Sequence, residues 1–250
     1  MKTIRKLPLL LAAIALCAAS SLRAEGHHWS YRGHTGPGHW AELENDFAAC
    51  KQGHAQSPID IRGAKAGDLP PIVFDYKPSP LRVVDNGHTI QVNYAPGSSI
   101  SVGGTRYELV QFHFHRPSEE KVQGKSHDMV AHLVHKSAEG KLAVVAVLLD
   151  KGGASVPAIE TLWAHIPKEK EKEAAPDVTV DAAALLPSDK GYYAFQGSLT
   201  TPPCSEDVRW LVLKQPLRIA DREIAAFGKL YSMNARPVQP LNGRLVEATR

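Results

Sequence analysis

The chain has little cysteine, no internal repeat and no long apolar run beyond its first residues. Three cysteines in 250 residues exclude a small scaffold stapled by many disulfides. The lack of a repeat of roughly 20–50 residues excludes a repeat protein. Outside the N-terminus, no stretch is long and apolar enough for a transmembrane helix. No basic patch is interleaved with aromatic residues, which argues against nucleic-acid binding.

The N-terminus has the pattern of a secretory signal peptide. Basic residues among the first six precede an apolar run over residues 7–19, which is too short to span a bilayer comfortably. Cys17 follows Leu16, where a lipoprotein would carry a small residue, so a lipid anchor is disfavoured. The pattern therefore predicts export without a membrane anchor.

Cleavage is expected after Ala24, with Ala19 as a second candidate. Residues 1–24 would then be the signal peptide and residues 25–250 a single mature domain, soluble in the periplasm or secreted. Four of the 29 basic residues lie in the signal, so the mature chain carries a net charge of about −1 with neutral histidine. The basic isoelectric point of 8.7 belongs largely to the signal.

The mature chain keeps two cysteines, Cys50 and Cys204. In an oxidising compartment an even pair predicts a disulfide. Closing a loop of about 150 residues would stabilise the fold by roughly 4–5 kcal/mol if chain entropy dominates. Two buried free thiols are the alternative, and the wide spacing disfavours a zinc knuckle.

Short strand-like segments separated by turn signals dominate the chain. We expect an α+β, β-dominated fold, a single domain around a large, twisted, mainly antiparallel sheet with short peripheral helices. The apolar run 142–149 predicts a central strand covered on both faces. Helices are expected over 157–165 and 221–230, and the charge run 168–173 is expected to be a surface loop. The expected strands are residues 72–76, 81–85, 89–94, 99–102, 106–115, 129–136, 142–150, 192–196 and 208–213.

Twelve histidines are many for this length, and three of them suggest a metal site. His113 and His115 are two residues apart on an expected strand, so they share one face. His132 lies on the next strand, about 4.8 Å away, close enough for three imidazoles to converge. Three histidines with one open position are typical of catalytic zinc. The alternative is that the first pair merely faces solvent. His135 lies an odd number of residues from His132, so it is expected to face away.

Further motifs follow one another along nearly the whole mature chain. They are His28-Trp29-Ser30-Tyr31, Gly36-Pro37-Gly38-His39-Trp40, Gln56-Ser57-Pro58-Ile59, Asn86-Gly87-His88, Gln111-Phe112-His113-Phe114-His115, His132-Leu133-Val134-His135, Gly197-Ser198-Leu199-Thr200-Thr201-Pro202-Pro203, Asn234-Ala235-Arg236-Pro237 and Gln239-Pro240-Leu241. This set resembles the α-class carbonic anhydrases, in particular their secreted bacterial branch. Cys50 and Cys204 fall where that branch places its disulfide.

The resemblance implies reversible hydration of carbon dioxide to bicarbonate and a proton. It assigns Zn²⁺ to His113, His115 and His132, with hydroxide on the zinc attacking the carbon. Carbonic anhydrases are the standard example of zinc lowering the pKa of bound water to about 7.

The resemblance also implies roles for residues around the zinc. Thr200 would orient the hydroxide and donate a hydrogen bond to Glu119, and Thr201 would lie beside the substrate. His88, as an exposed imidazole with a pKa near 6.5, would carry the proton to buffer. The apolar wall beside carbon dioxide would be Val134, Val144, Leu199, Val208 and Trp210, whose alternative role is ordinary core packing. The supporting residues would be Gln111 for His113, the Asn234 carbonyl for His115, and Tyr31, Asn86 and Gln91 for cavity waters.

Two positions depart from the family pattern. The family usually has Glu two residues before the third zinc histidine, but this chain has Val130. His132 would then lack a carboxylate partner, and losing such a partner typically costs 10–100-fold in metal affinity or activity. Glu120 stands where the family usually has His or Asn, and two adjacent carboxylates raise the pKa of one of them. We therefore expect a competent but weaker zinc site.

Two rival functions share this scaffold. One is a non-catalytic binding module, which is disfavoured because no zinc histidine is missing. The other is a zinc hydrolase acting on esters, but Leu199 and Val144 imply a small pocket. The expected partner is the small-molecule substrate alone, and a homodimer is an option that the sequence leaves open.

Overall fold

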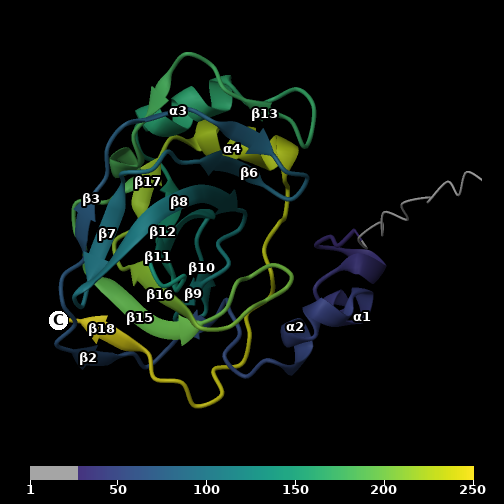
Figure 1. Ribbon diagram of the computed structural model, residues 1–250, viewed down its shortest axis with the longest axis vertical. Coiled ribbons are helices and arrows are strands. Elements are labelled where there is room, and N and C mark those ends of the chain that lie inside the picture. Colours follow the sequence, from purple (N-terminus) through teal and green to yellow (C-terminus); the bar gives the residue numbers. More distant parts are fainter. Residues whose placement is uncertain (1–27) are drawn as a thin grey trace, which may run out of the picture.

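A 13-stranded mixed sheet runs through the computed structural model, which describes residues 28–250 (Figure 1). The expected signal peptide, residues 1–24, lies outside the described residues. The main path of the sheet consists, in spatial order, of β13 (Glu173–Ala174), β5 (Val83–Asp85), β6 (Ile90–Asn93), β8 (Thr105–His115), β11 (Met129–Ser137), β12 (Leu142–Lys151), β16 (Val208–Leu213), β15 (Tyr192–Gly197), β18 (Glu247–Thr249) and β2 (Lys65–Gly67).

The other strands are short. β7 (Ser99–Val102) pairs with β8 and with β3 (Val73–Asp75), and β17 (Leu217–Ile219) pairs with β12. A small separate sheet contains β1 (Asp60–Ile61), β9 (Lys121–Val122) and β10 (Lys125–Ser126), and β4 (Ser79–Pro80) pairs with β14 (Thr179–Val180). The β-dominated fold with a mainly antiparallel sheet is therefore confirmed. The sheet is mixed because β12 runs parallel to β16 and β17, and β18 runs parallel to β2.

The helices are short and lie at the periphery of the sheet. Figure 1 shows α3 (Pro157–Ala164) and α4 (Asp221–Leu230) together at one end of the molecule. The indole Nε1 of Trp163 joins them by donating to the carbonyl of Glu223 at 3.0 Å. The N-terminal part carries η1 (Gly33–Thr35), α1 (Trp40–Leu43), η2 (Asn45–Phe47) and α2 (Ala49–Gln52), and η3 (Ala182–Leu185) precedes β15. Both α3 and α4, the two longest helices among the described residues, lie where the sequence predicts helices.

Strand β12 divides the apolar core into two layers. Its alternate residues Ala143, Val145, Val147 and Leu149 join the larger cluster, and Val144, Ala146 and Leu148 join the smaller one. Every residue from 143 to 149 is buried, as expected for a central strand covered on both faces. The smaller cluster lies on the face that carries the expected metal-binding histidines, because Val130 and Val144 belong to it.

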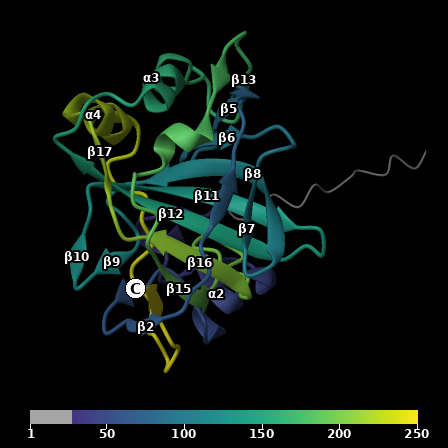
Figure 2. The same cartoon turned by 90° about the vertical axis from the view of Figure 1, so that its left-hand side faces the viewer.

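The register of β8 and β11 sets the position of the three histidines. The two strands lie side by side (Figure 2). His132 lies directly opposite His113, and Val130 lies opposite His115. Side chains two residues apart on a strand share a face, so His113, His115 and His132 face the same side. A register shift follows Val134, after which His135 faces the other layer and contacts the hydroxyl of Tyr76 at 2.8 Å.

A disulfide joins Cys50 to Cys204, as predicted, and closes a loop over a sequence separation of 154 residues. It packs with Trp40, and the carbonyl of Cys204 accepts a hydrogen bond from the side-chain Nε2 of Gln56 at 2.9 Å. The bond ties the N-terminal helices to the loop that follows β15.

Two further expectations concern the surface. The charge run 168–173 is exposed, as predicted, although Glu173 begins β13 and pairs with β5. Among the described residues, no helix is both long enough and apolar enough to cross a membrane.

Candidate metal centre

Three imidazoles meet on one face of β8 and β11. The ring centroids of His113 and His115 are 5.0 Å apart, those of His113 and His132 5.5 Å, and those of His115 and His132 4.8 Å. Each ring offers one nitrogen, and these nitrogens all lie within 4.8 Å of one another. Within residues 28–250, this is the only group of three or more His, Cys, Asp or Glu side chains with such geometry.

Outer acceptors hold two of these rings, as expected from the sequence. Nδ1 of His113 is 2.8 Å from the side-chain oxygen of Gln111. Nδ1 of His115 donates to the backbone carbonyl of Asn234 at 2.8 Å. Because an acceptor occupies Nδ1 in each ring, the lone pair of each Nε2 is left toward the centre. Nε2 of His115 is buried and has no hydrogen-bond partner among the described residues.

The expectation that His132 lacks a carboxylate partner is wrong. Glu120 supplies the carboxylate, with its two oxygens 3.0 and 3.2 Å from Nε2 of His132. Both side chains are completely enclosed, with about 1% exposure or less. Val130 is also fully buried, but it packs in the apolar cluster. The sequence could not show this exchange, because the contact depends on how the loop between β8 and β11 folds back.

The environment opposes positive charge on two of the three imidazoles. Burial, followed by the neighbouring His132, lowers the pKa of His113 to about 3, and the same causes lower the pKa of His115 well below its usual value. Burial also lowers the pKa of His132, but the charge and hydrogen bond of Glu120 outweigh it and the net shift is upward. Neutral imidazole is the form that binds metal, so His113 and His115 are preset for ligation.

A second buried carboxylate, Glu119, borders the same centre. Its Oε2 lies 3.5 Å from Nε2 of His115 and 3.9 Å from Nδ1 of His132. Burial raises the pKa of Glu119 to about 7; His132 opposes this shift, Glu120 adds to it, and a hydrogen bond with Thr200 acts against it. The expected effect of adjacent carboxylates is thus present, but burial is the larger cause. A cation at the centre would favour the charged form.

Arg236 holds Glu119 in place, a role that we did not predict. Its backbone N–H donates to Oε1 of Glu119 at 2.7 Å. Its guanidinium donates to the carbonyls of Ser57 at 2.7 Å and Cys50 at 2.8 Å. The disulfide region and the carboxylate are therefore fixed by one residue. Arg236 stands in a motif that carries the resemblance, which was the only signal available.

Thr200 lies on a closely held loop after β15. Its side chain is buried, with 5% exposure, and Thr201 is partly buried. On either side of this pair, Leu199 N–H donates to the carbonyl of Ser205 at 2.9 Å and Cys204 N–H donates to the carbonyl of Thr201 at 2.8 Å. Tyr31 lies close enough for Glu119 to affect it: burial, then Glu119, raises the pKa of Tyr31 well above its usual value.

The five residues expected to form an apolar wall belong to one cluster. Val144, Val208 and Trp210 are buried in it, and Val134 and Leu199 pack against it. Strand register places Val134 opposite Val144, and Val144 opposite Trp210. The ring centroid of Trp210 lies 4.9 Å from that of His132. The wall is therefore adjacent to His132.

Comparison with known proteins gives a consistent result. The family model for eukaryotic-type carbonic anhydrase matches residues 35–250. A carbonic anhydrase from Nostoc sp. is 43% identical over 236 residues, covering 92% of this chain and 89% of the relative. A carbonic anhydrase from Neisseria gonorrhoeae is 43% identical over 247 residues, covering 97% of each chain. This chain belongs to the alpha carbonic anhydrase family.

Solved structures of carbonic anhydrases share its fold. A hyperthermostable carbonic anhydrase identified from an active hydrothermal vent chimney superposes with a TM-score of 0.86 at 45% identity, covering 89% of this chain and all of that one. The chain is therefore a carbonic anhydrase, and hydration of carbon dioxide is the general reaction of its family.

In this carbonic anhydrase, the environment of the expected proton carrier, His88, differs from the one predicted from the sequence. His88 is half-buried instead of exposed, and its ring stacks on Trp29 with centroids 3.6 Å apart. Burial, followed by the neighbouring His28, lowers the pKa of His88 to about 4, below the expected value near 6.5. Sequence reasoning missed the stacking because Trp29 lies far from His88 along the chain.

The two expected amide side chains lie near this histidine. Oδ1 of Asn86 accepts from the backbone N–H groups of His88 and Thr89 at 3.0 and 2.9 Å, which shapes the turn. Gln91 lies opposite His113 across β6 and β8, and its Oε1 is 3.5 Å from Nδ2 of Asn86. These contacts form a polar rim between His88 and the three imidazoles.

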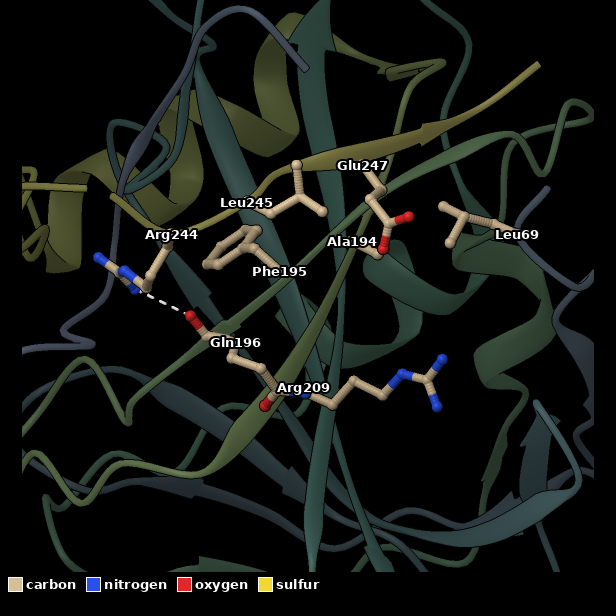
Figure 3. Close-up of a pocket in the computed structure, with 8 residues that line it drawn as sticks. All are labelled: Leu69, Ala194, Phe195, Gln196, Arg209, Arg244, Leu245 and Glu247. Atoms are coloured by element: carbon tan, nitrogen blue, oxygen red, sulfur yellow. Dashed lines mark hydrogen bonds between the residues drawn. The ribbon is translucent and has the colours of Figure 1, made fainter. Parts of the chain in front are cut away.

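A surface pocket of about 350 Å³ lies elsewhere on the enzyme, over β15, β16 and β18 (Figure 3). It is lined by Leu69, Ala194, Phe195, Gln196, Arg209, Arg244, Leu245 and Glu247. A guanidinium N–H of Arg244 donates to the carbonyl of Gln196 at 2.9 Å. None of the expected site residues lines this pocket, so it is separate from the candidate metal centre.

Proposed function

We propose that the chain holds one zinc ion through His113, His115 and His132 and hydrates carbon dioxide reversibly to bicarbonate. The observation that supports this proposal is the arrangement of nitrogens: an outer acceptor occupies one nitrogen of each ring, and the free nitrogens come within 4.8 Å of one another. Three imidazole nitrogens with a fourth position left for water are a donor set typical of catalytic zinc.

The residues present fit a zinc ion. Nε2 of His115 is buried and unpartnered among the described residues, which is costly for a polar atom unless an additional group binds it. A bound cation would satisfy this nitrogen. Zinc supplies Lewis acidity that lowers the pKa of a coordinated water, so that hydroxide is available near neutral pH.

Thr200 and Glu119 are proposed to orient the nucleophile. Thr200 lies close enough to Glu119 to lower the pKa of that carboxyl, and its hydroxyl is proposed to donate to the Glu119 carboxylate. The hydroxyl oxygen then remains free to accept a hydrogen bond from the attacking oxygen. The backbone N–H of Arg236 donates to Oε1 of Glu119, and this bond fixes the orientation of the carboxylate that faces Thr200. Positioning of this kind lowers the barrier because the reacting atoms are held in the attack geometry.

Carbon dioxide is apolar, and the apolar wall is proposed to receive it beside the nucleophile. Val134, Val144, Leu199, Val208 and Trp210 leave its oxygens without competing polar partners, and Thr201 lies on the loop beside them. His88 is proposed to pass the product proton to solvent through waters held near Asn86 and Gln91.

We further infer that residues 1–24 direct export, and that the mature enzyme is periplasmic or secreted. The disulfide between Cys50 and Cys204 supports this inference, because disulfides persist in oxidising compartments.

The test compares three forms of the purified mature chain: as isolated, stripped of metal by a chelator, and reloaded with zinc. Carbon dioxide hydration and hydrolysis of an activated ester are measured for each. We expect hydration to disappear on stripping and to return with zinc, with ester hydrolysis as a weak side reaction. Ester hydrolysis without hydration would favour the hydrolase, and a zinc-loaded chain inactive in both assays would favour a binding module.

A further inference from the structure

The carboxylate that reaches His132 comes from a loop instead of from the neighbouring strand position. We propose that Glu120 is the positioning residue for His132, and that it replaces a carboxylate at residue 130. This inference rests on the proposed zinc site. Glu120 does not touch the free nitrogens of the three imidazoles; it acts on the metal site through His132 alone.

The contact determines which nitrogen of His132 carries the proton. A carboxylate can only accept hydrogen bonds, so Nε2, at 3.0 and 3.2 Å from the two Glu120 oxygens, bears the hydrogen. Nδ1 then keeps its lone pair. That atom borders Oε2 of Glu119 at 3.9 Å, as does Nε2 of His115 at 3.5 Å, so both free nitrogens face the same centre. Carboxylate–imidazole pairs of this kind orient the ring and strengthen it as a ligand.

The loop that carries Glu120 is fixed on both sides. The Ser118 hydroxyl donates to the carbonyl of Glu120 at 2.7 Å, and it accepts from the backbone N–H of His127 at 2.9 Å. After Glu120, the backbone N–H of Lys121 donates to the carbonyl of Ile59 at 3.2 Å, where β9 pairs with β1. The backbone that carries Glu120 is therefore held in place on both sides, and the carboxylate itself is held by its contacts with His132.

The apolar side chain of Val130 is suited to a site in which Glu120 supplies the carboxylate. It lies two residues before His132 on β11, so both side chains share a face. Val130 has no exposed surface and packs in the apolar cluster with Val144 and Leu148. Since Glu120 already occupies Nε2, a glutamate at 130 would bury a second carboxylate beside an imidazole with no proton left to offer. Buried charges without partners are costly, so the two positions are expected to depend on each other.

The experiment uses the mature chain with four variants: Glu120→Gln, Val130→Glu, the double variant Glu120→Val/Val130→Glu, and Glu223→Gln. Glu223 is a matched control because its side chain is also buried, but it lies in the first turn of α4. Its Oε1 accepts from the Ser155 hydroxyl and from the Val156 N–H. Zinc affinity is measured by competition with a chromophoric chelator. The tautomer of His132 is read in metal-free protein from long-range nitrogen–proton NMR correlations, at an alkaline pH where the imidazole is neutral because Glu120 raises its pKa. Circular dichroism reports folding.

We expect wild-type His132 to carry its proton on Nε2. Glu120→Gln should weaken zinc binding about 10–100-fold. Val130→Glu alone should bind zinc no more tightly than wild type, and the double variant should recover most of the affinity lost in Glu120→Gln. Glu223→Gln should lower stability and leave zinc affinity unchanged, which separates positioning from a general loss of structure.

Two results would overturn the proposal while leaving the proposed function intact. One is a wild type that binds zinc and hydrates carbon dioxide, with Glu120→Gln binding zinc equally tightly. The other is a wild-type His132 that carries its proton on Nδ1, a readout that needs no variant to fold. A wild type that binds no zinc would instead refute the metal site itself, together with this inference.

Discussion

The imidazole of His88 lies face to face with the indole of Trp29, with ring centroids 3.6 Å apart and planes inclined by 8°. This stacking shields one face of the histidine from water, and His28 lies at 5.3 Å from the same ring. Burial is the largest cause that lowers the pKa of His88 to about 4, and the neighbouring His28 is the second. In this ring position, His88 is neutral at neutral pH, so it would hold the product proton only transiently before releasing it to solvent.

Removing the stacking partner should therefore raise the pKa of His88. Trp29→Ala is expected to move it from about 4 toward the usual 6.5, because burial is the largest cause of the shift. The pKa is measured by NMR titration of the imidazole carbon-bound protons. Trp163→Ala is the control, since Trp163 packs on Phe114 and Phe227 on another part of the molecule. An unchanged His88 pKa in Trp29→Ala would show that the stacking does not set it.

His88→Ala should slow carbon dioxide hydration in weak buffer. The expected loss is about 10-fold or more, because proton transfer by a positioned group typically contributes 10²–10⁴-fold and buffer replaces part of it. Added imidazole buffer should restore part of the rate, and zinc content should not change. A variant as fast as wild type in weak buffer would mean that the proton leaves by another route.

Thr200→Val should abolish most hydration without releasing zinc. Valine keeps the shape of threonine but can neither donate to Glu119 nor accept from the nucleophile, so we expect a loss of about 100-fold. Thr200→Ser, which keeps the hydroxyl, should retain most of the activity. Both variants are assayed with stopped-flow carbon dioxide hydration after their zinc content is matched. Equal rates for the valine and serine variants would rule out the orienting role.

His135 should make the folded state sensitive to acid. Burial lowers the pKa of His135 to about 3 from a usual value of 6.5, so the unfolded chain binds the proton first as pH falls. The free energy of unfolding therefore falls as the pH drops from 6.5 to about 3, and at pH 5 it is lower by about 2 kcal/mol. Glutamine at 135 can still contact the Tyr76 hydroxyl but does not titrate. The free energy of unfolding, measured in urea, should therefore fall by about 2 kcal/mol less between pH 7 and pH 5 in His135→Gln than in wild type. Parallel pH profiles for the two proteins would contradict this assignment.

Much of the metal centre could be predicted from residue spacing. Alternation along Gln111–His115 places two histidines on one face, and a following apolar strand carries the third. The register of β8 and β11 then brings His113 opposite His132. Local periodicity determines which way side chains point, so the shared face of His113 and His115 required no knowledge of the tertiary fold.

The contact between Glu120 and His132 could not be predicted in this way. Val130 correctly indicated that a carboxylate is missing from β11, but nothing local shows where a replacement comes from. Glu120 reaches the imidazole only because β9 and β10 fold the loop back against β1. The stacking of Trp29 on His88 has the same origin, since it joins the N-terminal segment to a turn between β5 and β6.

Which strands of the mainly antiparallel sheet pair in parallel could not be predicted either. The apolar run on β12 correctly predicts a strand covered on both faces, but it does not determine the direction of the neighbours. Pairing of β12 with β16 depends on the long connection between them, which includes α3, η3 and β15. Strand direction is thus a property of chain topology, and sequence periodicity does not encode it.

The central claim is that three imidazoles from β8 and β11 hold one zinc ion that hydration requires. Zinc per chain, measured by atomic absorption alongside carbon dioxide hydration, tests it most directly in wild type, His132→Ala and His135→Gln. His135 is the control because it lies on the same strand but faces the opposite layer. We expect about one zinc and full activity in wild type and His135→Gln, and neither in His132→Ala. Retention of zinc and hydration by His132→Ala would contradict the account.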